Sequence, residues 1–434
     1  MSEEKQYADF DLSISCEGET FYAKVIDSPA GPTARQTIPS PFEGMGPVEL
    51  ILRLENAVLS SIGNRRGRSS RGEAILKDFG RKVFNVVFRG SSQIAVQFNS
   101  SLSMVASNPD YEGLRVKLRI ESPELSQWPW EYVYDESKKN YLCLRERSPI
   151  VRFLEVNEPS GELEVEGRLN ILGMIANPGG EWSTLDTERE RKIIDDAIAP
   201  LQEQGKVKFR WVAGETIDDL LDAMQRDSWH VFHFIGHGGV FEYDEDEPMT
   251  GPPGERDTGF IVLSDGAGGA AEISASSLKN VLQGQSLRLV LLNCCEGARG
   301  GSKDAFSSTG ASLVRSGIPA VVAMQFPISN VAATQFANGF YKSLATNASL
   351  EKAMTWARVR MSHASEMEWG IPVLFTRYPS GRLFNLRGAD DPDTLPPPTR
   401  QPAREEAPAP IESAQELARK ELSKLFHGSL GSRD

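Results

Sequence analysis

The chain has 434 residues, 40% of them hydrophobic, and its 60 acidic and 47 basic residues give a formal net charge of −13. Its length predicts about two to three domains, and its negative charge argues against a general affinity for nucleic acid or anionic membranes. The sequence has no signal-peptide core and no apolar run near the roughly 18 residues of a membrane span. We therefore expect a cytoplasmic protein that binds neither nucleic acid nor membrane directly.

The chain contains four cysteines: Cys16, Cys143, Cys294 and Cys295. Four cysteines are too few for a disulfide framework at this length, so we expect free thiols in a reducing compartment. A zinc site needs about four ligands, commonly in Cys-x-x-Cys pairs, and the sequence has no such pair. We therefore predict no metal site and no cofactor.

Residues 1–160 mix two periodicities. Residues 21–27 and 114–122 alternate as strands do, whereas residues 47–63 have the spacing of an amphipathic helix. These patterns predict an N-terminal α/β domain over residues 1–160.

From residue 161 to residue 387, continuous apolar runs recur between helical stretches. This pattern is typical of a parallel sheet that is covered on both faces. The apolar runs, each of which contains a predicted strand, are residues 169–178, 207–214, 230–239, 259–265, 287–295, 318–327 and 371–376. The clearest helices are residues 215–227, 272–284, 305–317 and 331–346. We expect Thr216 to be an N-cap and Gly317 to follow the end of a helix.

The third region, residues 388–434, is rich in proline and charge, which predicts a disordered linker. Within this region, residues 413–430 have Leu417, Leu422, Leu425 and Phe426 near one face of a short helix. Two interpretations of this helix stay open, a frayed tail and a docking peptide.

Reactive side chains stand at two of the predicted strand ends, where functional groups gather in parallel sheets. His237 comes after one strand, between two glycines, and Cys294 and Cys295 end another. A cysteine and a histidine so placed can perform acyl transfer, because the imidazole assists the thiolate and backbone N–H groups stabilise the oxyanion. A buried sheet with a chance histidine explains the same spacing. We expect His233, inside the strand, to be a hydrogen-bonded core residue.

The segments VFHFIGHGG (231–239) and LVLLNCCEGARGG (289–301) resemble the two catalytic motifs of CHAT-domain proteins. These are caspase-like cysteine peptidases related to separases, metacaspases and caspases. Residues 318–329 and 369–376 resemble later strands of that family, and residues 114–156 resemble the segment that usually precedes a CHAT domain.

The resemblance implies an α/β fold with a caspase-like, mostly parallel sheet flanked by helices over residues 161–387. A degenerate caspase-like domain is one interpretation of residues 1–160. Cys295 stands where the family has its nucleophile, and His237 where it has its histidine. The implied oxyanion hole consists of the backbone N–H groups of Cys295 and Gly238. Cys294 occupies the position of a small residue, and we interpret it as a packing residue.

The resemblance further implies a regulated endopeptidase, in which Cys295 attacks a peptide carbonyl and His237 protonates the leaving amine. CHAT peptidases commonly act in bacterial antiviral defence or cell death. The implied substrate is a protein such as a gasdermin-like pore former, a caspase-like zymogen or a regulator, and a separate sensor or activator subunit is expected. The alternative function is a non-catalytic caspase-like scaffold that mediates assembly.

Acidic residues crowd positions 242–247, just after the predicted catalytic histidine. The segment can be a solvated mobile loop, a negative rim that favours basic substrates, or a cation site, although it lacks EF-hand spacing. No basic cluster lies beside the two motifs. We therefore expect the residue before the cleaved bond (P1) to be basic or small rather than aspartate.

Overall fold

The structure is a computed structural model. It describes residues 5–18, 20–42, 44, 47–60, 69–89, 92–156, 161–179, 182–240, 259–282, 284, 286–294 and 305–387. All of them fall in one unit, residues 1–395. The acidic segment 242–247, Cys295 and the region 388–434 lie outside the described residues, so the predictions for them stay predictions.

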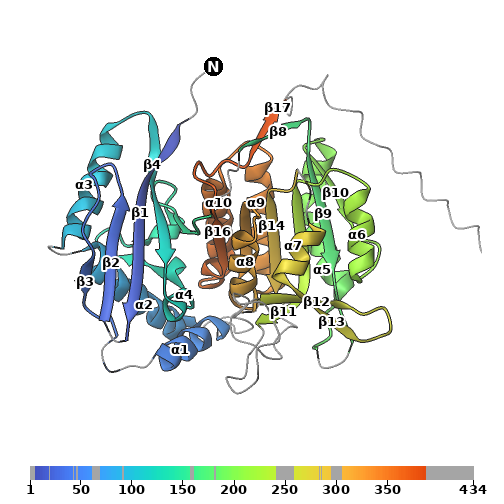
Figure 1. Cartoon of the computed structure of the whole chain (residues 1–434), viewed down its shortest axis with the longest axis horizontal. Helices are drawn as coiled ribbons and strands as arrows, with labels where there is room; N and C mark the ends of the chain where they lie inside the picture. Colours follow the sequence, from blue (N-terminus) through green and yellow to red (C-terminus); the bar gives the residue numbers. More distant parts are fainter. Residues whose placement is uncertain are drawn as a thin grey trace, which may run out of the picture. The chain divides into compact units, whose positions relative to one another are not determined.

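Most of the described strands join one 13-stranded sheet (Figure 1). In spatial order its main path is β10 (Val207–Trp211), β9 (Leu169–Ile175), β11 (Val231–Val240), β14 (Leu289–Cys294), β15 (Ala320–Met324), β16 (Pro372–Thr376), β7 (Ile150–Phe153), β4 (Tyr111–Ile120), β1 (Gln6–Glu17), β2 (Thr20–Asp27) and β3 (Gln36–Ile38). Strand β12 (Gly259–Ser264) pairs with β11, and β13 (Ala270–Ser274) pairs with β12. Two small sheets pair β17 (Phe384–Arg387) with β8 (Leu163–Glu166), and β5 (Tyr134–Asp135) with β6 (Asn140–Tyr141).

Strand direction changes once in the middle of this sheet. Strands β10, β9, β11, β14 and β15 are parallel to one another, as are β16, β7, β4 and β1. The pair β15–β16 is antiparallel, as are the pairs formed by β12, β13, β2 and β3. The expected α/β fold with a mostly parallel sheet is confirmed. The predicted strands 259–265 and 371–376 are the exceptions, because β12 and β16 run antiparallel to the group formed by β10, β9, β11, β14 and β15.

Helices flank this sheet. The α-helices are α1 (Pro47–Leu59), α2 (Ser69–Phe88), α3 (Gln93–Ser107), α4 (Pro123–Ser126), α5 (Thr187–Glu203), α6 (Ile217–Gln225), α7 (Ala275–Val281), α8 (Ala305–Arg315), α9 (Asn330–Leu344) and α10 (Leu350–Ala364). Short 3₁₀ turns are η1 (Trp130–Tyr132), η2 (Leu142–Leu144) and η4 (Glu368–Gly370).

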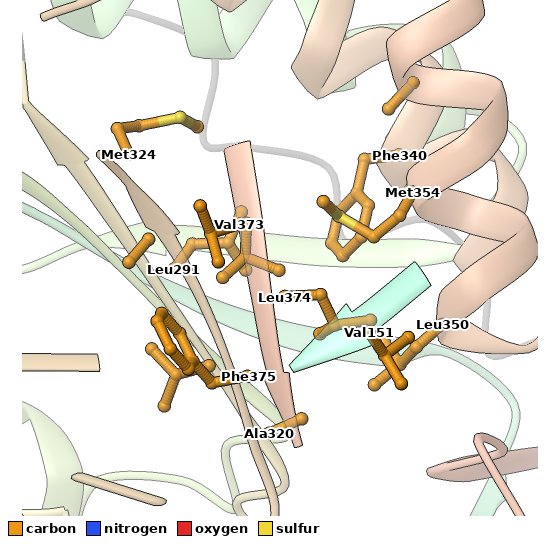
Figure 2. Close-up of a cluster of buried hydrophobic side chains, with 14 of the residues drawn as sticks. Val151, Leu291, Ala320, Met324, Phe340, Leu350, Met354, Val373, Leu374 and Phe375 are labelled. Atoms are coloured by element: carbon orange, nitrogen blue, oxygen red, sulfur yellow. The ribbon is translucent and has the colours of Figure 1, made fainter. Parts of the chain in front are cut away.

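Helices α9 and α8 cover opposite faces of the sheet. In Figure 2, Leu374 of β16 lies toward Phe340 of α9, whereas its neighbour Phe375 lies on the other side of the strand. Phe375 meets α8 there, because a Cβ added to Gly310 would lie 3.2 Å from its ring. Alternation along a strand sends consecutive side chains to opposite faces, so the continuous apolar run of β16 follows from burial on both sides.

The two predicted helix ends are confirmed, and one predicted helix is shortened. Thr216 caps α6, since its side chain accepts from Asp219 N–H while the Asp219 carboxylate accepts from Thr216 N–H. Gly317 follows α8 with φ of 118°, a left-handed conformation that favours glycine. The helix expected over 272–284 begins only at Ala275, because the preceding residues form β13 and Ser274 caps α7.

Strands from both sides of residue 160 belong to the same sheet. The join is narrow, since β7 pairs with β16 only at Phe375 and Thr376. Val151 of β7 also shares a buried cluster with Leu350 and Met354 of α10 (Figure 2). The domain division at residue 160 therefore stays a prediction.

Arg115 of β4 also crosses this join. Its guanidinium contacts the carboxylates of Glu351 on α10 at 2.5 Å and Asp9 on β1 at 2.7 Å, and the side chains of Arg115 and Glu351 are 2% and 0% exposed. Removing one member of such a buried group leaves uncompensated charge, which typically costs about 3–5 kcal/mol.

We therefore expect Arg115→Ala to lower the free energy of unfolding by about 3–5 kcal/mol, measured by denaturant titration. Adding Glu351→Gln should recover part of this loss, because it removes one stranded carboxylate. Arg35→Ala breaks the exposed ion pair with Glu17 and should leave the unfolding midpoint nearly unchanged. Equal effects of Arg115→Ala and Arg35→Ala would contradict the prediction.

Candidate active site

His237 lies where β11 changes its partners. β11 pairs in parallel with β9 as far as Ile235 and with β14 as far as Gly236, and from His237 onward it pairs antiparallel with β12. The expectation that His237 follows the strand was wrong, because the new pairing with β12 extends β11 to Val240. His237 is thus held in extended backbone and not in a free loop.

The connection between β9 and α5 packs over the imidazole of His237. Nε2 of His237 lies 2.7 Å from the backbone carbonyl oxygen of Ser183. A carbonyl oxygen only accepts, so Nε2 must carry the hydrogen and donate it. The Trp182 ring lies beside the imidazole, with centroids 5.3 Å apart. In the neutral ring this hydrogen bond leaves Nδ1 as the nitrogen with the free lone pair.

Burial favours the neutral form of His237. The residue is 2% exposed, and desolvation lowers its pKa from the ordinary value of 6.5, while the hydrogen bond to Ser183 acts in the opposite direction. A histidine whose pKa lies below 6.5 is mostly unprotonated at pH 7. The ring can therefore accept a proton at Nδ1, which is what a general base requires.

The register of β11 and β14 brings the two predicted catalytic segments together. Gly236 of β11 pairs with Cys294 of β14. His237 follows Gly236 in the chain and Cys295 follows Cys294, but Cys295 lies outside the described residues. Gly238, the second predicted oxyanion residue, lies in β11 and pairs with Ile261 of β12. The roles of Cys295 and Gly238 in an oxyanion hole stay predictions.

Asn293 is a polar residue of this site that the sequence reasoning missed. It pairs with Ile235 in the parallel register, so by alternation it lies on the sheet face that carries His237. The residue is 4% exposed, and its Oδ1 accepts no hydrogen bond from the part of the chain that the structure describes. A single polar residue at the end of the apolar run LVLL was the available signal.

The other two histidines of β11 and its entrance are core residues. His233 is buried, and its Nδ1 lies 2.9 Å from the hydroxyl oxygen of Tyr341, which confirms the expected hydrogen-bonded core role. Nδ1 of His230 accepts from the Asn170 N–H at 2.9 Å. Burial lowers the pKa of His233 to about 3 and that of His230 to about 4, so both are neutral near pH 7.

Among the described residues, no group of three or more His, Cys, Asp or Glu side chains is arranged to hold a metal ion. None of the helices they form is both long enough and apolar enough to cross a membrane.

Residues 99–406 match the family model of the CHAT domain. Similar solved structures include two crystal structures of the Saccharomyces cerevisiae separase–securin complex. They share 10% sequence identity with this chain, with TM-scores of 0.43 and 0.42, and the matches cover 87% and 85% of it. The chain spans only 30% of the length of the chains it matches. No curated protein matches the sequence.

Proposed function

Because this chain belongs to the CHAT domain family, whose members are caspase-like cysteine peptidases, we propose that it is a cysteine endopeptidase that uses Cys295 as nucleophile and His237 as general base and acid. The pairing of Gly236 with Cys294 carries the proposal. Each proposed catalytic residue is one peptide unit beyond a member of that pair.

The hydrogen bond to Ser183 supports a specific proton path. Since Nε2 of His237 holds its hydrogen against the Ser183 carbonyl, Nδ1 is the atom that takes the proton from the Cys295 thiol. The thiolate then attacks the peptide carbonyl carbon, and the negative oxygen is stabilised by backbone N–H groups, for which we propose Gly238 and Cys295.

Collapse of this intermediate breaks the C–N bond, and the imidazolium of His237 gives its proton to the leaving amine. The acyl group stays on the sulfur as a thioester. His237 then removes a proton from water, and the hydroxide attacks the thioester carbonyl. Departure of the thiolate, which regains its proton from the imidazolium, releases the carboxylic acid product and restores the enzyme.

The proposed substrate class and setting rest on the family resemblance of the two motifs, and the proposed P1 residue rests on the absence of a basic cluster beside them in the sequence. We propose a protein substrate with a basic or small P1 residue, and the candidates are a gasdermin-like pore former, a caspase-like zymogen and a regulator. The same resemblance favours a bacterial defence or cell-death system in the cytoplasm, with a separate sensor or activator subunit.

The proposal is tested by incubating the full chain, alone and together with its candidate partner protein, with internally quenched peptides. These peptides have blocked termini and a randomised P1 position. An endopeptidase cleaves inside these peptides, and prior alkylation with iodoacetamide should stop the cleavage. Alkylation-sensitive cleavage after basic or small residues is the expected result. A strong P1 aspartate preference would contradict the proposed specificity. Failure to cleave both the peptides and the partner would favour a non-catalytic scaffold.

A further inference from the structure

The Ser183 carbonyl that orients His237 belongs to the β9–α5 connection. Asn177, near the start of this connection, hydrogen-bonds to its later residue Leu185. The Asn177 side chain binds one backbone residue twice: its Oδ1 accepts from the Leu185 N–H at 2.8 Å, and its Nδ2 donates to the Leu185 carbonyl at 3.3 Å. A side-chain amide has a donor and an acceptor side by side, so it can pair with both backbone groups of one residue. This double contact fixes the chain two residues after Ser183.

Glu215 holds Asn177 from the other side. Its carboxylate Oε2 accepts from the Asn177 N–H at 2.9 Å, and its backbone carbonyl accepts from the Ser264 N–H at 2.9 Å. Ser264 ends β12, the strand whose Val262 pairs with His237. Glu215 therefore ties the start of the β9–α5 connection to the strand that pairs with His237.

The β9–α5 connection also packs closely against the turn that follows β12. A Cβ added to Gly179 would lie 2.5 Å from the carbonyl oxygen of Gly268, so only a glycine fits there without movement. At its start, the Ala176 N–H donates to the carbonyl of Ile235, two residues before His237. The connection is thus anchored to β11, to the β12–β13 turn and to itself.

We propose that Asn177 and Glu215 are positioning residues for His237, acting through the carbonyl of Ser183. We call the contacts that Asn177 and Glu215 make in this connection the clamp. This inference rests on the proposed function, because it assigns the clamp a purpose in catalysis. A backbone carbonyl can select the Nε2–H tautomer only while it stays within hydrogen-bond distance. The present separation is 2.7 Å, and a displacement of about 1 Å would place it beyond the range of a hydrogen bond.

The two side chains meet different chemical requirements, which allows matched variants. Asn177→Asp keeps an acceptor for the Leu185 N–H but loses the donor to the Leu185 carbonyl, and Asn177→Ala loses both. Glu215→Gln keeps an acceptor oxygen for the Asn177 N–H, and Glu215→Ala loses it. If the clamp positions His237, the order of effect should be Glu215→Gln smallest, Asn177→Asp intermediate, and the two alanine variants largest.

The first measurement does not depend on peptidase activity. The full chain has five histidines, so ¹⁵N labelling of histidine gives few signals, and the spectrum of His237→Ala identifies those of His237. At pH 7 we expect His237 to be in the Nε2–H tautomer in the wild type and in Glu215→Gln. In Asn177→Ala and Glu215→Ala, a mixture of the two tautomers is expected.

The second measurement is steady-state kinetics on a peptide that the wild type cleaves. Misplacement of a catalytic group by about 1 Å can cost about 10²-fold in rate. We therefore expect kcat to fall by about 10- to 100-fold in the two alanine variants while KM stays within about twofold. Glu215→Gln should restore most of kcat, which a role limited to stability would not require.

The outcomes separate the two proposals. A folded alanine variant that keeps both the wild-type tautomer and the wild-type kcat overturns the positioning role, whatever the enzyme cleaves. A wild type that stays inactive together with its candidate activator subunit, while its tautomer still responds to the variants, overturns the peptidase proposal and supports the clamp. Should Asn177→Ala fail to fold, Asn177→Asp and Glu215→Ala provide the same comparison. Intact folding is checked by the unfolding midpoint of each variant.

Discussion

Cys295→Ala is expected to lower kcat/KM for peptide cleavage by at least about 10⁴-fold, because no other atom at this position can form the thioester. Cys294→Ala should retain most of the activity. Cys294 ends β14 in register with Gly236, and the sequence pattern predicts that it fills a packing position next to the nucleophile. Two adjacent thiols therefore have opposite expected consequences when replaced.

The comparison is made on the same quenched peptide with equal amounts of folded protein. Limited iodoacetamide treatment followed by peptide mass spectrometry gives a second readout, in which Cys295 should be alkylated first. Cys143 is a suitable internal reference, because it is fully buried and burial raises its pKa to about 11. Loss of activity in Cys294→Ala with retention in Cys295→Ala would reverse the assignment of the nucleophile.

Much of the fold could be predicted, because a strand that is buried on both faces of a sheet has a continuous run of apolar residues. The runs at 169–178, 230–239 and 287–295 are apolar without alternation, and the structure places β9, β11 and β14 side by side. Direction was harder to predict. Residues 371–376 have the same apolar character whether β16 runs with β15 or against it, since that choice depends on the path of the chain between them.

The surroundings of His237 could be predicted only in part. Its position at the carboxyl end of an apolar strand was readable, whereas its hydrogen bond joins residues 54 positions apart in the sequence. Ser183 acts through its backbone carbonyl, which every residue type has, so no side-chain signal marks it. The roles of Asn177 and Glu215 could not be predicted from the sequence either. Their side chains bind backbone groups of residues in irregular segments, and no residue pattern marks such partners.

His237→Ala is expected to lower kcat/KM at pH 7 by about 10²- to 10⁴-fold, the usual contribution of general acid–base catalysis. The change also removes the group that sets the acid limb of the pH profile. In the wild type, activity should fall as pH falls through the pKa of His237, since the protonated ring cannot accept the thiol proton. Burial lowers that pKa from 6.5, so the acid limb should lie below pH 6.5.

The measurement is kcat/KM between pH 5 and pH 9 for the wild type, His237→Ala and His233→Gln. His233 is bonded to Tyr341 inside the core, so His233→Gln should keep the acid limb of the wild type, whereas His237→Ala should lose it. An acid limb at or above pH 6.5 would contradict the general-base mechanism. It would require a neighbour that favours the imidazolium more strongly than burial opposes it. A neutral thiol–imidazole pair and a thiolate–imidazolium pair hold the same single proton, so in either form this limb marks the addition of a second proton to the Cys295–His237 pair.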